Sequence, residues 1–116
     1  MTITRIEPGK RLSAAVRHGN TLYVAGQTAD TDTGSIELQT KEVLAKLDRL
    51  LGLGGSSKAK LISINVYLAS IADFAEMNKV YDAWLDTANL PARATVETRL
   101  ASPNLRVEMT AIAATD

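Results

Sequence analysis

Hydrophobic residues recur along this chain with two different periods, and each period predicts a different kind of element. Apolar side chains return every three to four positions in Ile36–Leu51 and Asp73–Leu85, as on one face of a helix. Elsewhere, short runs alternate between apolar and polar residues or are rich in β-branched residues, which predicts strands. The predicted strands are Met1–Ile6, Ser13–Arg17, Thr21–Ala25, Leu61–Ala69, Arg93–Leu100 and Leu105–Ala111.

The pattern within these elements also predicts which side chains are buried. Thr21–Ala25 consists of β-branched, aromatic and apolar residues throughout, and we expect it to be buried on both faces. Leu61–Ala69 has one apolar face, formed by Ile62, Ile64, Val66 and Leu68, which we expect to receive the helices. In the second helix the recurring large residues are predicted to be core: Phe74, Met77, Tyr81 and Trp84.

Local sequence signals predict three further features of the helices. Asp73 and Glu76 have the spacing of a capping box at the start of the second helix. Glu42 and Lys46 are four residues apart, in the order that favours an ion pair on a helix surface. Gly52 is predicted to end the first helix.

The order of these elements, β-β-β-α-β-α-β-β, predicts an α+β fold. The 116 residues form one domain, 1–116, because the chain is long enough for a single hydrophobic core. We expect one mixed sheet with both helices packed on the same face. Its other face carries side chains such as Ser63, Asn65 and Tyr67, too apolar for bulk water and too polar for a core. We therefore expect a second subunit to cover that face.

Composition narrows the classes of function. The 13 basic residues balance the 13 acidic ones, which argues against wholesale binding to nucleic acid or a membrane surface. The chain has no cysteine, which excludes a disulfide, a thiolate nucleophile and a thiolate metal site, and its only histidine, His18, falls in a predicted turn. No apolar run approaches the roughly 20 residues of a membrane span, so a cytoplasmic protein is expected.

Two residues are candidates for binding a ligand, and a third has an unusual position. Arg93 follows Pro91-Ala92 at the start of a strand, where a rigid backbone would hold its guanidinium group in place to bind a carboxylate or phosphate. The alternative is that Arg93 forms a salt bridge on the surface. Gly26 directly follows an apolar strand, where it would let a ligand approach the backbone, or is an ordinary strand-to-loop glycine. Glu108 is a carboxylate in a strand interior, where carboxylates are depleted.

Several of these segments together resemble the Rid family of reactive-intermediate deaminases, also called the YjgF family. The segments are Tyr23-Val24-Ala25-Gly26-Gln27, Gln39-Thr40, Pro91-Ala92-Arg93-Ala94-Thr95-Val96-Glu97, Val107-Glu108 and Ala111-Ile112-Ala113. The resemblance implies a chorismate-mutase-like fold, last strands that are not hairpin partners, and a homotrimer with its sheets inside and clefts between subunits. It also implies hydrolysis of 2-imino acids and enamines to 2-keto acids and ammonia, with no metal or organic cofactor.

The resemblance further assigns roles to individual residues. Arg93 matches the arginine that binds the substrate carboxylate, Gly26 a backbone N–H donor, and Glu108 the acid that orients or activates water. Three substrate-binding positions depart from the usual family pattern: Leu12 replaces a tyrosine, Ala25 a serine and Thr95 a cysteine. Because Leu12 and Ala25 lack the usual hydroxyl groups, the expected cleft is more apolar than in other family members.

Three functions follow as hypotheses. The first is deamination of 2-imino acids, and the second is binding of a small carboxylate or regulation by a trimer that uses the same cleft without turnover. The third is a ribonuclease or inhibitor of translation, which the balanced charge and the single histidine disfavour. We expect a small carboxylate or imino acid as the ligand, and neither nucleic acid nor a membrane as a partner.

Overall fold

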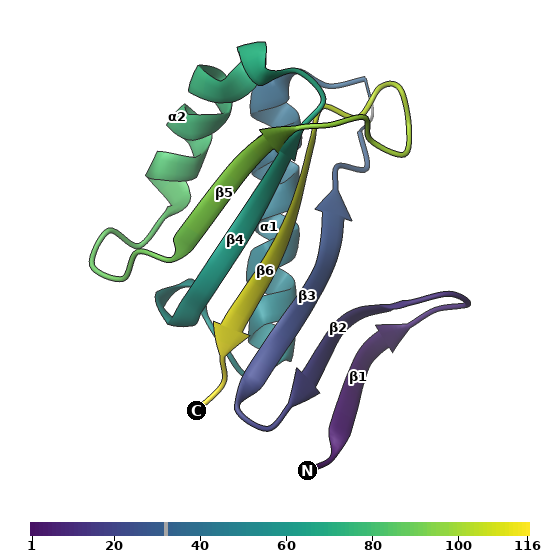
Figure 1. Cartoon of the computed structure of the whole chain (residues 1–116), viewed down its shortest axis with the longest axis vertical. Coiled ribbons are helices and arrows are strands. Elements are labelled where there is room, and N and C mark those ends of the chain that lie inside the picture. Colours follow the sequence, from purple (N-terminus) through teal and green to yellow (C-terminus); the bar gives the residue numbers. More distant parts are fainter. Residues whose placement is uncertain (32) are drawn as a thin grey trace.

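The computed structural model, which describes residues 1–31 and 33–116, contains one six-stranded sheet in the order β1-β2-β3-β6-β4-β5 (Figure 1). The strands β4 and β5 run parallel, and every other neighbouring pair is antiparallel. The predicted element order and mixed sheet are confirmed. The last two strands are not hairpin partners, since β4 lies between them. The strand bounds are β1 Ile3–Pro8, β2 Ser13–His18, β3 Thr21–Thr28, β4 Leu61–Leu68, β5 Ala92–Glu97 and β6 Val107–Ala114.

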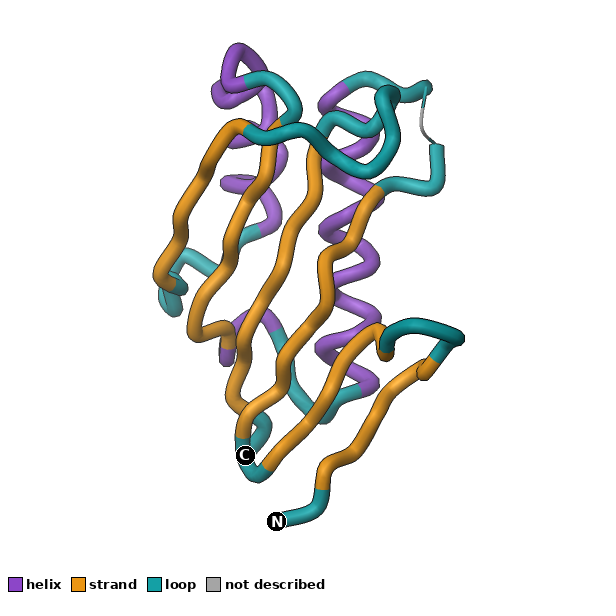
Figure 2. The backbone as a smooth tube through the Cα atoms, turned by 45° about the vertical axis from the view of Figure 1, so that its right-hand side comes forward, coloured by secondary structure: helices purple, strands orange, loops and turns teal. Residues whose placement is uncertain are grey.

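Both helices, α1 (Ile36–Leu53) and α2 (Phe74–Trp84), lie on the same face of the sheet, as predicted (Figure 2). Short 3-10 turns at Lys58–Lys60 and Ile71–Asp73 precede β4 and α2. At the start of α1, the Ser35 hydroxyl accepts a hydrogen bond of 3.1 Å from the Leu38 N–H. The helix continues through Gly52 to Leu53, with Gly54 as its C-cap, so the end predicted from the sequence is wrong by two residues.

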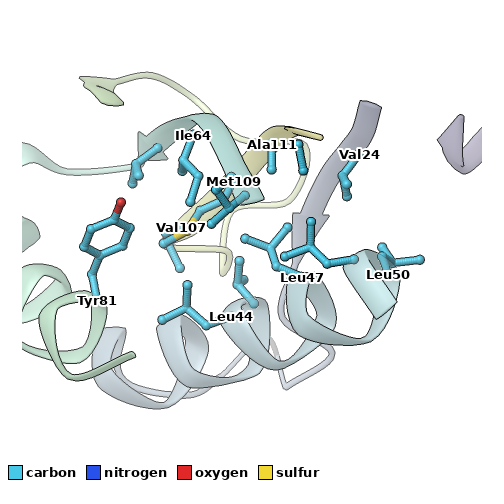
Figure 3. Packing of buried hydrophobic residues seen from close by; sticks show 14 of the residues in the cluster. Val24, Leu44, Leu47, Leu50, Ile64, Tyr81, Val107, Met109 and Ala111 are labelled. Carbon is cyan, nitrogen blue, oxygen red and sulfur yellow. The ribbon is translucent and has the colours of Figure 1, made fainter. Parts of the chain in front are cut away.

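The core fills the space between α1 and the central strands. Leu44, Leu47 and Leu50 project from α1 toward Met109 of β6 and Val24 of β3, as the close view shows (Figure 3). Burial of such side chains stabilises the fold by roughly 1.5–3 kcal/mol each. The apolar side chains that recur along α1 therefore pack against the apolar side chains that alternate along β6.

Two strand predictions are wrong because burial and register depend on partners. Tyr23 of β3 is 48% exposed between buried Leu22 and Val24, so this strand is covered on one face only. Ile62 is 50% exposed, and Leu61 is buried in its place. The ladder between β4 and β6 passes from the Leu61–Ala113 pair to the Ser63–Ile112 pair, which leaves one extra residue in β4 and reverses the alternation there.

Polar contacts near the helices also differ from the local signals. The Asp73 side chain does not cap α2 but accepts a hydrogen bond of 3.1 Å from Arg106 Nη2. Lys46 does not pair with Glu42; its Nζ lies 2.7 Å from a carboxylate oxygen of Asp30. In both cases a partner distant in sequence displaces the one expected from helix spacing.

None of the helices in the described part of the chain combines the length and the hydropathy that a membrane span requires.

Replacement of a core leucine provides a test of this packing. Leu47 is completely buried, whereas Leu53, at the end of the same helix, is 55% exposed. We expect Leu47→Ala to lower the free energy of unfolding by about 2–5 kcal/mol, because it leaves a cavity that the rigid sheet cannot close. Leu53→Ala should change it by less than about 1 kcal/mol. Urea denaturation of both variants measures the difference, and equal losses would contradict the described core.

Candidate functional site

Arg93 lies on β5 at the edge of the sheet and points toward α2. It pairs with Ile64 in the parallel ladder, and Ile64 is completely buried on the helix-covered face. Since in-register neighbours point to the same side of a sheet, the Arg93 side chain shares that face. Its Nη1 donates a hydrogen bond of 2.8 Å to Asn78 Oδ1, and its Cζ lies 4.7 Å from the centre of the Tyr81 ring.

The Arg93 guanidinium has no carboxylate partner among the described residues. The ion pairs found in residues 1–31 and 33–116 involve other residues, so the salt-bridge alternative has no support there. The neighbours of Arg93 are an amide and two aromatic rings, with Phe74 at 5.8 Å. Burial raises the pKa of the Tyr81 hydroxyl, and Arg93 lowers it by a smaller amount, so the phenol stays neutral. The positive charge of Arg93 is therefore held in place but not neutralised.

The sequence carries a signal for these supporting residues, although their contact with Arg93 was not predicted. Phe74, Asn78 and Tyr81 follow one another at intervals of four and three residues, so they share one face of α2. Asn78 was the one amide within an otherwise apolar stripe. Phe74, predicted as core, is 40% exposed and instead lies beside Arg93.

Glu108 lies on β6 and points to the face of the sheet that the helices leave open. Its neighbours in sequence, Val107 and Met109, are completely buried on the helix side, so alternation directs Glu108 the other way. It pairs with Thr28 of β3 and Tyr67 of β4. The carboxylate thus projects from the middle of the sheet rather than from a loop.

Gly26 lies directly beside Glu108. A side chain built on Gly26 would overlap Glu108 Oε2 and place its Cβ 3.0 Å from the carboxylate carbon, so the glycine makes room for the acid. The prediction that β3 ends at Gly26 is wrong. The strand continues to Thr28, and its ladder with β6 shifts between Val24 and Gln27 around the glycine.

Arg93 and Glu108 do not meet within one chain. They lie on opposite faces, with β4 between their strands. Their partners on β4, Ile64 and Tyr67, are three residues apart. That offset corresponds to about 10 Å along the strands, and two strand spacings add about 10 Å across them. A small substrate cannot contact both side chains of the same chain.

The other predicted substrate-binding residues divide between the same two places. Thr95 follows Arg93 on the helix face, and its Oγ1 is buried without a hydrogen-bond partner among the described residues. Ala25 is half-buried next to Gly26. Leu12, in the loop between β1 and β2, is 66% exposed.

The hollows found in the described part of the chain do not join these places. One of about 700 Å³ is lined by Ala69 and by the segment from Glu97 to Leu105, and it includes neither Arg93 nor Glu108. The other, of about 350 Å³, lies between the outer surfaces of α1 and α2. Among residues 1–31 and 33–116, no group of three His, Asp or Glu side chains could hold a metal ion.

Comparison with known proteins identifies the family. A family model described as endoribonuclease L-PSP matches residues 2–115. A RutC family protein of Haemophilus influenzae is 43% identical over 114 residues, which cover 97% of this chain and 98% of that protein. A solved YjgF-family structure from Neisseria meningitidis superposes with a TM-score of 0.97 at 38% identity, covering 100% of this chain and 97% of that one. The chain belongs to the Rid/YjgF family.

The match extends to other members of the Rid/YjgF family. The RutC family protein YoaB of Escherichia coli is 40% identical over 114 residues, covering 98% of this chain and 99% of that protein. A YjgF-family structure from Mycobacterium tuberculosis has a TM-score of 0.87 at 28% identity, over 97% of this chain and 99% of that one. The resemblance seen in the sequence is therefore confirmed, and so is the α+β fold that it implied.

The contact between Gly26 and Glu108 leads to a structural prediction. Gly26→Ala should displace the Glu108 carboxylate, because the new methyl group would overlap Oε2. Gly52→Ala is the matched control: its methyl group would meet no atom within 4 Å, and in the last turn of α1 it should change the free energy of unfolding by less than about 1 kcal/mol. Crystal structures of both variants show the outcome. An unmoved Glu108 in Gly26→Ala would contradict the described contact.

Proposed function

We propose that this Rid/YjgF protein hydrolyses 2-imino acids and their enamine tautomers to 2-keto acids and ammonia, in clefts between the subunits of a homotrimer. The observation that carries the proposal is the state of Arg93, which is oriented by Asn78 and Tyr81 yet lacks a carboxylate partner among the described residues. A guanidinium in this state binds a substrate carboxylate through its remaining N–H groups.

The reaction places modest demands on the site. Water adds to the imine carbon of R–C(=NH)–COO⁻, and collapse of the resulting carbinolamine expels ammonia to leave R–CO–COO⁻. Because the imine carbon is already electrophilic, the protein has to position the substrate and a water and to move protons. Glu108, on the open face beside Gly26, is the proposed group that orients this water and accepts its proton. The proposed site includes no metal and no organic cofactor.

Arg93 and Glu108 lie too far apart to act together within one chain, which supports assembly of the site from two copies of the protein. One copy would supply Arg93 with Thr95, and another would supply Glu108 with Gly26, Ala25 and Leu12. The open face of the sheet also exposes apolar side chains, including Tyr23 at 48% and Val96 at 46%. Exposure of this kind on a sheet face is typical of a subunit interface. A trimer with its sheets inside would cover the face and create the clefts.

The family model carries the description endoribonuclease, which raises RNA as a substrate. Several properties of this chain disfavour it. The formal net charge is zero, and the single histidine, His18, is exposed at the end of β2, where no described side chain forms a catalytic pair with it. Cleavage of RNA that persists in Arg93→Ala would point to a site elsewhere on the protein.

Removal of the Arg93 charge tests the proposed reaction. Imines are generated in situ from serine or threonine with a dehydratase, and their decay is followed with and without the protein. We expect Arg93→Ala to lower kcat/KM by about 10²- to 10³-fold, because a charge-assisted bidentate contact to the carboxylate is lost. Arg93→Lys should recover only part of this loss, since an ammonium cannot bind bidentately. Arg49→Ala, on the outer helix α1, is the control with unchanged activity.

Two outcomes of this assay would contradict the deaminase. One is imine decay that the wild-type protein does not accelerate, and the other is an Arg93→Ala variant as active as the wild type. If 2-oxobutanoate then raises the melting temperature of the wild type but not of Arg93→Ala, the cleft binds carboxylates without turnover.

Mixing two inactive variants tests assembly of the site from two copies. Arg93→Ala and Glu108→Gln are each expected to be inactive, yet unfolding and refolding them together should restore activity. In a random 1:1 mixture, roughly a quarter of intersubunit clefts would receive both native residues. Light scattering of the mixture checks the trimer. Activity cannot be restored if both residues act from one chain, because every chain in the mixture lacks one of them. A mixture that stays inactive would therefore contradict the proposed assembly from two copies.

A further inference from the structure

Gln39 is a completely buried amide that joins three segments of the chain. From the first turn of α1, its Nε2 donates hydrogen bonds to the backbone oxygens of Gly34, at 3.2 Å, and Asn104, at 3.0 Å. Its Oε1 accepts a hydrogen bond of 2.8 Å from the Arg106 N–H. The amide therefore uses both of its donors and one acceptor site on backbone groups of the segments before α1 and before β6.

Two of these bonds hold the segment that leads directly into β6. The Arg106 backbone is also fixed by its oxygen, which accepts a bond of 3.1 Å from Ala69 N–H just beyond β4. The β4–β6 ladder then begins at the Leu68–Val107 pair, and Glu108 is the next residue. Gln39 thus sets the place where β6 enters the sheet, two residues before the carboxylate.

The neighbouring residue Thr40 shows that burial of a polar group in α1 does not by itself produce this connection. Thr40 is also completely buried, but its Oγ1 bonds the oxygen of Ile36 at 2.7 Å within the same helix. It contacts no backbone group of the segment before β6 through that hydroxyl. Of these two adjacent buried polar side chains, Gln39 is the one that bonds the segment before β6, through Asn104 and Arg106, 65 and 67 positions away.

We propose that Gln39 is a positioning residue for Glu108. This inference rests on the proposed function, in which Glu108 orients the attacking water. Gln39 touches neither substrate nor water; it fixes the backbone from which the carboxylate projects. Catalytic steps that depend on a positioned water are sensitive to displacements of about 1 Å, which can cost roughly 10²-fold in rate. Arg93 is held by Asn78 and Tyr81 of α2, so we expect carboxylate binding to change little when Gln39 is replaced.

The test compares Gln39→Met with Thr40→Val. Methionine keeps the length of the side chain and removes all three hydrogen bonds, whereas valine keeps the shape of threonine and removes only the bond within the helix. We expect Gln39→Met to lower kcat by about 10- to 100-fold with KM within about threefold of wild type. Amide hydrogen exchange of residues 106–109 should become faster. Thr40→Val should retain the wild-type kcat and the wild-type exchange at 106–109, whatever its melting temperature.

The other outcomes bear either on the positioning role of Gln39 or on the proposed function. A wild-type kcat in Gln39→Met, or equal losses of kcat in both variants, overturns the positioning role. If the wild-type protein hydrolyses no imine, the proposed function fails, and a crystal structure of Gln39→Met then decides the positioning role alone. A displaced Glu108 carboxylate would support it, and a carboxylate in its wild-type place would overturn it.

Discussion

The alternation of side chains across a sheet that is covered on one face constrains every other feature of this protein. Val107 and Met109 enter the core from β6, so Glu108 between them has to face away from the helices. Ile64 enters the core from β4, and its pairing with Arg93 in the parallel ladder places the Arg93 side chain on the same, helix-covered face. A slip of one residue in either strand would turn its apolar set toward water. Packing of the core thereby determines where both charged residues lie, on opposite faces of the sheet.

Much of this arrangement could be predicted from the sequence because it rests on local periodicity. The stripe that contains Leu44 and Leu47, and the alternation in β6, are properties of single segments. The errors arose where a second segment decides the outcome. Ile62 is exposed because the ladder with β6 contains a bulge, which the alternation of apolar and polar residues in β4 alone does not reveal. Tyr23 is exposed because nothing in the described chain packs on its face.

The candidate residues could be named from the sequence, but their arrangement in space could not. Arg93 was identifiable from the proline that precedes its strand, and Glu108 from its unusual place in a strand interior. Their separation depends on the order of strands and on the registers of two ladders, which no short segment encodes. The bond from Gln39 to Arg106 shows the same limit, since its partners lie 67 positions apart.

The surroundings of three arginines show how the same side chain serves different ends. Arg49 forms two hydrogen bonds, of 2.6 and 3.0 Å, with the carboxylate of Glu7, and Arg106 bonds Asp73. In each of these pairs a carboxylate neutralises the charge, so the arginine serves the fold. Arg93 is held instead by an amide and an aromatic ring, which fix its direction without supplying a negative charge. A cation that is held by neutral partners keeps most of its attraction for an anion. None of the described residues supplies that anion to Arg93, and a substrate carboxylate would.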